Sequence, residues 1–565
     1  MNKITLEDII SRVKTESQIL YLSEEFPENV NIDLSEISDS KLFFQNIRAK
    51  TLTIENGELE LLQVSKQSSI DYLRIKNVKI GKVEISDCVI PNTFSFEDCT
   101  IDDFTAQRMN TMSHWLGFRN CPKIGAIDLQ TLIISQGLHI DGCPDIGSIR
   151  LYNVECPYGG LSLARSTVNG RTMIVASSKI KEVTIYQSVF NDNFKIESTV
   201  IDEMISIIEN TFNKSCSINL KKKDFNEKSI IQFTDSIYLD KTIFKDGFEV
   251  FGFDDAEYII NSIKITFNNQ LEGNINFKNL TISDIYLTGI ITKSEISLNN
   301  ISTDKVTIED LDNYSNFRLS TIKGNGNSEF NIINSNLGSA IVNDINFGDF
   351  ILKIIKSTYN KINYSNTIWP KDITVSNANY IIPSSEEHRR KQDSFRQLKQ
   401  AAKQNENKID ELDFQRKEWN SIRKQGISKE QSFLYILNDW IVIQSNRTNN
   451  YGTVWIWPIL LLLLSNLIFY IIQVVILSPD LTFSTVDSKF DSEILFTQLK
   501  DNIFMYWHFL NPTHNLKHID PILSENNYSE ILGNSKAMFW NYFMRIMTGY
   551  FIYQVIVGFR KFSRK

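Results

Sequence analysis

Apolar residues recur along most of the chain in two columns with a period of 11 residues. In the clearest stretch, one column consists of Leu163, Ile174, Ile185, Ile196, Ile207 and Ile218. The column two residues earlier consists of Leu161, Thr172, Val183, Phe194, Ile205 and Cys216. Side chains two residues apart lie on the same face of a β-strand. The pattern therefore predicts short strands that turn the same face inward every 11 residues.

The pattern returns further along the chain, at spacings of 10 to 11 residues. Its two columns there are Ile275, Ile285, Ile296 and Val306, and Phe277, Leu287, Leu298 and Ile308. Between Lys221 and Gln270 the register is less clean, and we expect an insertion or distorted turns there.

Two similar decapeptides, CPKIGAIDLQ and CPDIGSIRLY, begin 22 residues apart, at Cys121 and Cys143. Two 11-residue units would form one coil of about 22 residues, so we expect these cysteines to stack on successive coils.

Strands this short cannot enclose a core singly, but they can if the chain coils and each column becomes a ladder of like side chains. The sequence therefore predicts a mainly β fold, a right-handed β-solenoid over residues 40–375. Roughly 15 coils at about 4.8 Å each would extend for about 70 Å. Residues 1–39, with the helix-like LEDIISRV, are expected to cap the open first coil.

Charge density rises after the solenoid, and residues 385–445 follow helical spacing instead. The apolar positions are Phe395, Leu398 and Ala402, and then Ile409, Leu412, Trp419 and Ile422, with QNEN as a break between them. We expect an amphipathic helical hairpin, docked on the end of the solenoid or on a second copy of itself.

Two membrane spans are predicted next. Residues 453–478 carry no charge and are long enough to cross about 30 Å of hydrocarbon, with Trp455 and Trp457 at one end. Residues 537–559 are less apolar, because they include the intramembrane polar candidates Asn541, Arg545 and Gln554, with Gly549 among them. An arginine in hydrocarbon is costly unless it faces protein, water or a headgroup, so Arg545 is the best functional candidate. The alternative is that Arg545 snorkels to the interface.

Basic residues are abundant before the first span and in the tail 560–565, whereas the connecting segment 479–536 is richer in acids. The positive-inside rule then predicts a multi-pass protein of the inner membrane with both termini in the cytoplasm and 479–536 outside. Residues 501–512 are aromatic but too short to cross, so we expect an interfacial or re-entrant segment, with Tyr506, Trp507 and His508 as candidate pore-loop residues.

Other chemistry is sparse in the sequence. His514 and His518 have a spacing that suits a metal on a helix, but no acid or thiol accompanies them at a fixed spacing, so we expect exposed histidines and no metal site. The six cysteines form no CxxC pair and are expected to be small buried core residues. Acidic residues are scattered through turns, and no nucleotide loop or catalytic triad motif occurs, so neither an enzyme nor a cofactor is expected. A formal net charge of −8 makes nucleic acid a poor partner.

Three strings carry a family resemblance: SFRQLKQAAKQNENKIDELDFQRKEWNSIRKQ, SNRTNNYGTVW and YFIYQVIVGFRKFSRK. They resemble the C-terminal half of bacterial pentapeptide-repeat-type membrane proteins. The resemblance implies a β-solenoid, a helical pair and a two-span region that in some members is similar to two-helix ion channels, and it suggests a role in stress or phage defence. The chain departs from that family in lacking the five-residue A(D/N)Lxx consensus. It also has no TVGYG filter, so a selective potassium channel is not supported.

Two functions are compatible with this organisation. In the first, the protein is a membrane-anchored receptor or effector whose solenoid binds a cytosolic protein or ligand and whose spans form or gate a pore. Two helices cannot enclose a pore, so this function requires a homo-oligomer in the lipid bilayer. In the second, the solenoid is a recognition rod or scaffold that binds a cytosolic protein, and the spans only tether it.

Overall fold

The computed structural model divides the 565-residue chain into two units, residues 1–380 and 381–565, which we describe separately. It describes residues 19–22, 29–35, 40–45, 47–65, 68–112, 114–176, 180–197, 199–219, 231–232, 236–252, 258–267, 272–358, 361–375, 383–425, 456–478, 492–525 and 529–563.

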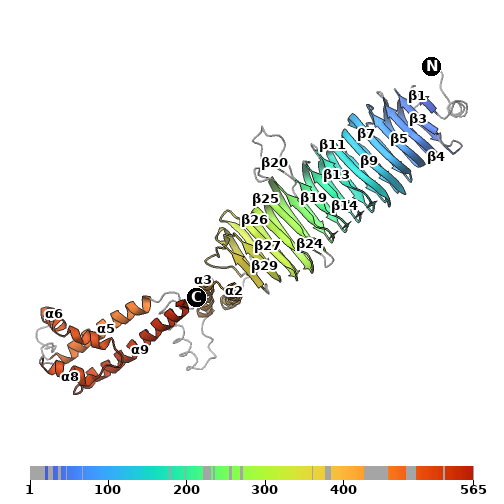
Figure 1. The fold of residues 1–565 in the computed structure, drawn as a ribbon. Coiled ribbons are helices and arrows are strands. Elements are labelled where there is room, and N and C mark those ends of the chain that lie inside the picture. The colour runs from blue at the N-terminus through green and yellow to red at the C-terminus, as the bar shows by residue number, and fades with distance from the viewer. Residues whose placement is uncertain are drawn as a thin grey trace. The chain divides into compact units, whose positions relative to one another are not determined.

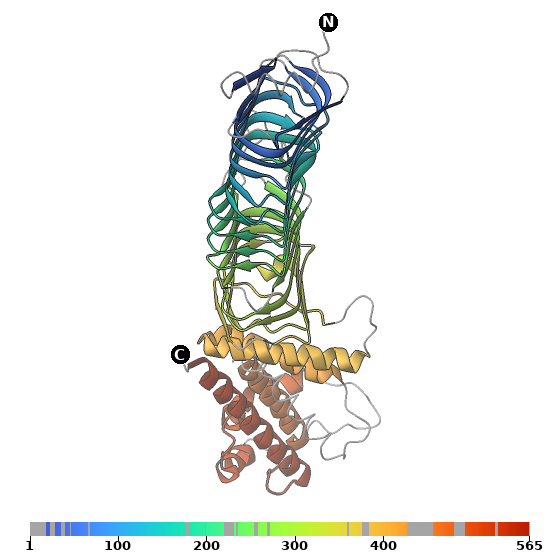
Figure 2. The same cartoon turned by 90° about the vertical axis from the view of Figure 1, so that its right-hand side faces the viewer.

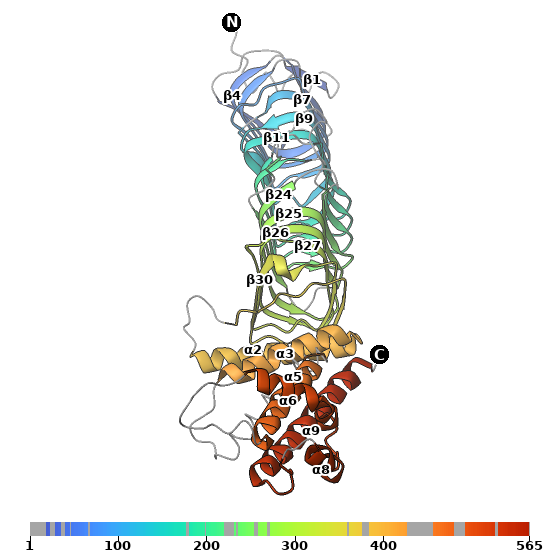
Figure 3. The same ribbon diagram turned by 90° about the vertical axis from the view of Figure 1, so that its left-hand side faces the viewer.

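The first unit is a parallel β-solenoid of about 13 turns, drawn from blue to yellow in Figure 1. Figures 2 and 3 show from two further sides how its strands stack in layers around a closed interior. Strands that follow one another on one side of the solenoid pair in parallel, one coil apart, as in the pairing of Leu163 with Ile185 and of Ile185 with Ile207. The predicted 22-residue solenoid is thus confirmed.

The strands of the solenoid are β1 (Ile19–Leu22), β2 (Asn29–Asp33), β3 (Ser40–Gln45), β4 (Arg48–Ser65), β5 (Ser69–Ser86), β6 (Thr93–Glu97), β7 (Thr100–Met112), β8 (Trp115–Arg119), β9 (Lys123–Ile134), β10 (Gly137–Asp141), β11 (Ile146–Ala164), β12 (Thr167–Val168), β13 (Thr172–Val175), β14 (Ile180–Tyr186), β15 (Val189–Phe190), β16 (Phe194–Glu197), β17 (Ile201–Ile208), β18 (Thr211–Phe212), β19 (Cys216–Asn219), β20 (Ile231–Gln232), β21 (Ser236–Asp240), β22 (Ile243–Phe244), β23 (Phe248–Phe251), β24 (Tyr258–Phe267), β25 (Ile275–Ile291), β26 (Ile296–Asn313), β27 (Asn316–Lys323), β28 (Ser328–Ile333), β29 (Ser339–Asn343), β30 (Phe350–Ile355) and β31 (Lys361–Ser365). A short 3-10 turn, η1 (Phe347–Asp349), precedes β30.

The interior of the solenoid consists of stacked apolar columns. Phe190 and Phe212 have ring centroids 4.7 Å apart and nearly parallel planes, and Phe212 stacks in turn on Phe244 at 5.2 Å. All three side chains are fully buried. Each coil therefore buries its inward side chains against the side chains at equivalent positions of the next coil, as the periodicity predicted.

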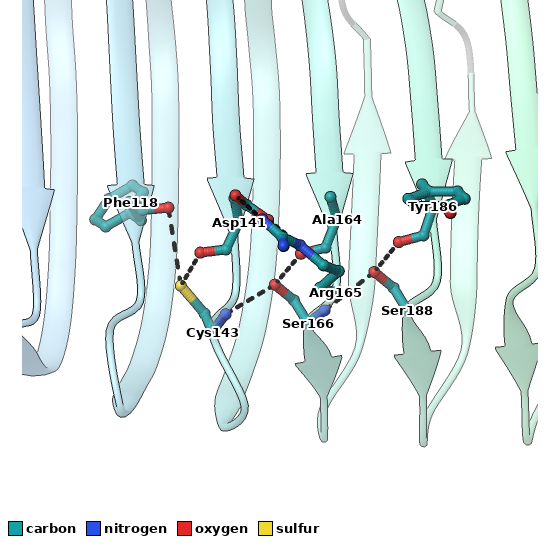
Figure 4. Close-up of polar contacts among 8 residues, drawn as sticks. All are labelled: Phe118, Asp141, Cys143, Ala164, Arg165, Ser166, Tyr186 and Ser188. Atoms are coloured by element: carbon teal, nitrogen blue, oxygen red, sulfur yellow. Dashed lines mark hydrogen bonds and ion pairs between the residues drawn. The ribbon is translucent and has the colours of Figure 1, made fainter.

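One corner of the solenoid holds a ladder of small polar side chains that runs along its axis (Figure 4). The backbone N–H of Cys143 donates to Ser166 Oγ (3.0 Å), that of Ser166 to Ser188 Oγ (3.2 Å), and that of Ser188 to Asn210 Oδ1 (2.7 Å). The hydroxyl of Ser166 donates in turn to the carbonyl of Ala164 (2.7 Å). These buried bonds satisfy backbone groups where strand pairing is interrupted.

The repeated cysteines occupy earlier positions of the same ladder. The Cys143 Sγ lies 3.8 Å from the carbonyl oxygen of Phe118 and 3.6 Å from that of Asp141, and Cys121 repeats both distances one coil earlier. All six cysteines are buried free thiols, and burial raises the pKa of Cys99 to about 11. Two predictions are thus confirmed: Cys121 and Cys143 stack on successive coils, and the cysteines are small buried core residues.

One coil of the solenoid is longer than the others, as the sequence predicted. Asn210 and Thr242 hold successive corner positions but are 32 residues apart, against 22 for Ser188 and Asn210. This is the insertion expected between Lys221 and Gln270, and such longer coils reduce the number of turns from the expected 15.

The predicted cap 1–39 is partly wrong, because β1 and β2 pair with β3 and β4 and so belong to the solenoid. LEDIISRV lies outside the described residues.

The second unit begins with the predicted hairpin, α2 (Ser384–Gln404) and α3 (Lys408–Gln425). Phe395, Leu398, Ala402 and Leu412 are buried as expected, but Ile409 is 79% exposed, and Phe414 is buried. The buried carboxylate of Glu418 joins the helices through Arg396 Nε (3.1 Å) and Lys399 Nζ (2.5 Å). Residues 426–445 of the predicted hairpin lie outside the described residues.

Within the described residues, five further helices follow: α5 (Ile456–Leu477), α6 (Ser492–Asp501), α7 (Ile503–Phe509), α8 (Leu516–Glu525) and α9 (Ser535–Ser563). Among the described residues, only α5 is both long and apolar enough to cross a membrane. Both predicted spans are thus helices, but the expectation of two apolar helices is met by α5 alone, because Asn541, Arg545 and Gln554 lower the apolarity of α9. In the segment 501–512, Asp501 ends α6 and the other residues form α7 and its flanking turns.

We expect Asn210→Ala to destabilise the solenoid by about 2–3 kcal/mol, because the amide is buried, accepts from Ser188 and donates to the carbonyls of Ile185 and Ile208. Urea unfolding of the full chain in micelles, followed by β-sheet circular dichroism, measures the loss. The control is Asn169→Ala, in an exposed ladder with Asp145 and Asn191, for which we expect less than about 0.5 kcal/mol. Equal losses for the two variants would contradict a special role for the buried corner.

Candidate functional site

Buried polar side chains join α5 to α9. Thr548 Oγ1 donates to Asn466 Oδ1 (3.1 Å), and Gln473 Nε2 donates to the carbonyl of Ala537 (2.8 Å). Asn466 and Gln473 lie seven residues apart, so they share the face of α5 that packs on α9. Interhelical hydrogen bonds of this kind stabilise helix pairs in apolar surroundings.

His514, in the turn between α7 and α8, is the centre of a second polar contact with α9. Its Nδ1 lies 2.8 Å from the carbonyl oxygen of Asn511, and its Nε2 lies 3.2 Å from Asn541 Nδ2. A carbonyl only accepts, so Nδ1 carries the proton and Nε2 accepts from the Asn541 amide. The imidazole is therefore neutral in this arrangement.

Arg545 fixes the same turn through its backbone. Its Nη2 donates to the carbonyl oxygen of His514 at 2.6 Å, and its guanidinium lies over the ring of Tyr542, 5.9 Å from the centroid. The Nε of Arg545 is buried and has no hydrogen-bond partner among the described residues. Arg545 thus faces protein, which is one of the surroundings that make an arginine tolerable near hydrocarbon.

The structure brings together only some of the residues that the sequence singled out. Asn541 and Arg545 meet at His514, while Gln554 is buried further along α9 and Gly549 borders open space.

The candidate pore-loop residues lie apart from this contact, on α7. Tyr506 is half-buried and donates to the carbonyl of Leu463 (3.3 Å), whereas Trp507 and His508 are exposed.

One of the three histidines lies in other surroundings than predicted. His508 and His518 are exposed as expected, but His514 is only 5% exposed. No group of three or more metal-ligating side chains occurs within the described ranges. The burial of His514 could have been predicted from Asn541 and Arg545, because polar side chains in an apolar helix need partners nearby.

The solenoid carries a groove that could not be predicted from the sequence pattern. It has a volume of about 650 Å³ and lies over successive strands, β6, β8, β10, β11 and β14. The row Ser95, Gly117, His139 and Ser162, paired in register, contributes mostly small side chains to its floor. Trp115 folds over Gly117, where an added Cβ would lie 2.8 Å from the indole ring. We call this hollow the Trp115 groove.

Charged side chains of both signs border the Trp115 groove. Glu97, Arg119 and Asp141 are neighbours in register on β6, β8 and β10. Arg165 forms a two-bond pair with Asp141, at 2.9 and 2.5 Å (Figure 4). Two acids and two bases leave this border without net charge.

We expect the helical unit to lose stability as the pH falls through about 6.5, the ordinary pKa of histidine. Burial lowers the pKa of His514, with the charges of Arg545 and His508 acting in the same direction. The unfolded chain then binds the proton more readily than the folded chain, so acid favours unfolding. Thermal melting of the helical signal in micelles at about pH 7.5 and pH 5 measures the effect.

His514→Asn should flatten this pH dependence, while His518→Asn, at an exposed position, should leave it unchanged. A pH dependence that persists in His514→Asn would assign it to another group.

No protein-family model matches the chain, and no curated protein and no solved structure matches it either.

Proposed function

We propose that the protein is a membrane-anchored recognition rod, in which the β-solenoid binds a partner and the helical unit tethers it to a lipid bilayer. The observation that carries this proposal is that polar groups of α5 and α9 are hydrogen-bonded within the helical unit itself. Asn466 bonds to Thr548, and Asn541 and Arg545 bond to the His514 turn, all within a single chain. These groups are engaged in holding the helices together, which is what a tether requires.

The outward faces of the same helices are apolar, which supports contact with lipid. Only 28% of the most apolar part of α5 is buried, whereas the core helix of a soluble protein would be mostly buried. The large exposed apolar side chains of α5 are Ile456, Trp457, Leu460, Leu463, Leu464, Leu467 and Ile468, and those of α9 are Phe539, Tyr542, Phe543, Ile546, Tyr553, Ile556 and Phe559. Large apolar side chains on the outer faces, with the polar side chains of the helices paired inside, suit a hydrocarbon solvent.

In this proposal α9 crosses the bilayer beside α5, with the solenoid and both termini in the cytoplasm of a bacterial cell. The 29 residues of α9 exceed the length needed to cross, so its basic end at Arg560 can lie in the headgroup region. The bond of Arg545 to the His514 carbonyl keeps its charge off the lipid face.

A pore formed by an oligomer, with a role in stress or phage defence, is the second candidate. It is favoured by the half-buried Arg545, whose Nε lacks a partner in the described part of the chain, and by the open space beside Gly549. A second copy could fill that space and turn Arg545 toward a shared axis.

The tether predicts that the full chain stays in bacterial membranes after washing with alkaline carbonate, because two apolar-faced helices are held by hydrocarbon. A variant that ends before Thr453 should be released, which immunoblotting of the pellet and supernatant measures. Release of the full chain would contradict an integral anchor.

The two candidates differ in liposomes that contain the full-length protein. The tether predicts that an entrapped potassium-sensitive dye reports no flux, and that Arg545→Ala lowers the melting temperature of the helical unit without making the bilayer leaky. A flux that disappears in Arg545→Lys or Arg545→Ala would favour the oligomeric pore instead. The variant that ends before Thr453 serves as the control.

A further inference from the structure

The Trp115 groove has the features of a ligand site. Trp115 is half-buried, and its indole lies flat over Gly117 beside the ring of His139, with centroids 5.6 Å apart. Any side chain at position 117 would collide with the indole, so the glycine is what allows the ring to lie flat against the sheet. The result is a rigid aromatic surface at the bottom of an open groove.

The charges around the groove narrow the class of ligand. Glu97, Arg119, Asp141 and Arg165 sum to zero, and the bond from Arg165 to Asp141 neutralises one pair directly. A polyanion such as nucleic acid needs a surplus of bases, which this border lacks. A neutral ligand with many hydrogen-bonding groups fits better, because the charged side chains offer it both donors and acceptors.

The backbone of the groove argues against a peptide. Gly117 pairs with Ser95 on one side and with His139 on the other, so the strands beneath the groove have no free edge. An extended peptide therefore cannot be bound by strand addition, the mode in which main-chain bonds provide affinity.

The same row of the sheet extends beyond the groove. From Ser162 it continues in register through Thr184, Ser206, Tyr238, Lys264 and Tyr286. A second hollow, of about 300 Å³, lies over this far part, where Lys264 Nζ is 5.7 and 5.6 Å from the ring centroids of Tyr238 and Tyr286. One face of the solenoid thus carries two hollows with aromatic side chains, which suits an elongated ligand along the axis.

We propose that this face binds a neutral oligosaccharide, with one sugar ring packed on Trp115 and its hydroxyls bonded to the charged border of the groove. A sugar ring has an apolar C–H face and a rim of hydroxyls, which matches an aromatic ring surrounded by Arg, Asp and Glu. The assignment rests on the proposed function, since it names the partner class of the recognition rod.

Isothermal titration of the full-length protein in lipid nanodiscs, with maltohexaose, cellohexaose and chitohexaose as probes, tests the proposal. Nanodiscs are preferred because maltoside detergents would compete for the site. We expect at least one hexasaccharide to bind with a Kd of about 1 mM or tighter, and Trp115→Ala to weaken it by about tenfold or more. Trp115→Phe should retain part of the affinity, since it keeps an aromatic surface.

Two further variants keep the test independent of folding. Arg119→Ala alters an exposed side chain of the groove and should also weaken binding, whereas Tyr152→Ala changes an exposed tyrosine outside the groove and should not. Melting temperatures of all variants show that the solenoid is intact.

The proposal is overturned if none of the three probes binds, or if binding is the same in Trp115→Ala and Arg119→Ala as in the unaltered chain. Binding of duplex DNA or of a peptide at Trp115 in place of the sugars would also overturn it. If the sugars fail while the chain stays in carbonate-washed membranes, the glycan assignment fails and the tethered rod stands. If the chain binds sugars but carbonate releases it from membranes, the glycan assignment stands and the membrane tether fails.

Discussion

Hydrogen bonding between the backbones of successive coils is the constraint on which the solenoid depends. Successive strands on one side of the solenoid pair in parallel, one coil apart, so an inward side chain lies on the equivalent side chain of the neighbouring coil. Corners interrupt this pairing, and their N–H groups would remain unsatisfied without Ser166, Ser188 and Asn210. A cysteine serves in the first coils of the ladder because Sγ is a weak acceptor and donor of nearly the right size.

The same register determines what the outer surface can become. Outward residues also stack in columns, so a small residue repeated over several coils leaves a hollow, and a large neighbouring side chain can cover its floor. Gly117 and Ser162 beside Trp115 have this effect on the groove. Because outward side chains contribute little to the core, the groove can change its chemistry without cost to the fold.

The sequence predicted the interior far better than the surface, because burial imposes a regular pattern on the chain and exposure does not. Burial forces a period of 11 residues on the chain, and that period revealed the coil length, the stacked cysteines and the insertion before Gln270. The short strands β1 and β2 were missed because four or five residues carry too little of the period to be recognised.

The candidate sites were harder to predict, because a period does not say which outward residues share a hollow. Glu97, Arg119 and Asp141 come from separate coils, and only the register brings them together. His514 was read as exposed because its partners, Asn541 and Arg545, lie 27 and 31 residues further along the chain. The polar residues of α9 were recognised from their cost in hydrocarbon, but their partners depend on how the helices pack.

The helical unit differs from the solenoid in its outer faces: polar groups pair within an apolar interior, while large apolar side chains lie exposed on α5 and α9. In hydrocarbon an unpaired amide or guanidinium costs far more than in water, so such groups are paired or turned toward water. Asn466, Asn541 and Arg545 each find a partner in their own chain, and a pore would have to break some of these bonds before water could replace them. For a single chain, an interior in which these polar groups are paired therefore has the lowest free energy. Conduction would need the binding energy of further copies to offset the loss of these hydrogen bonds.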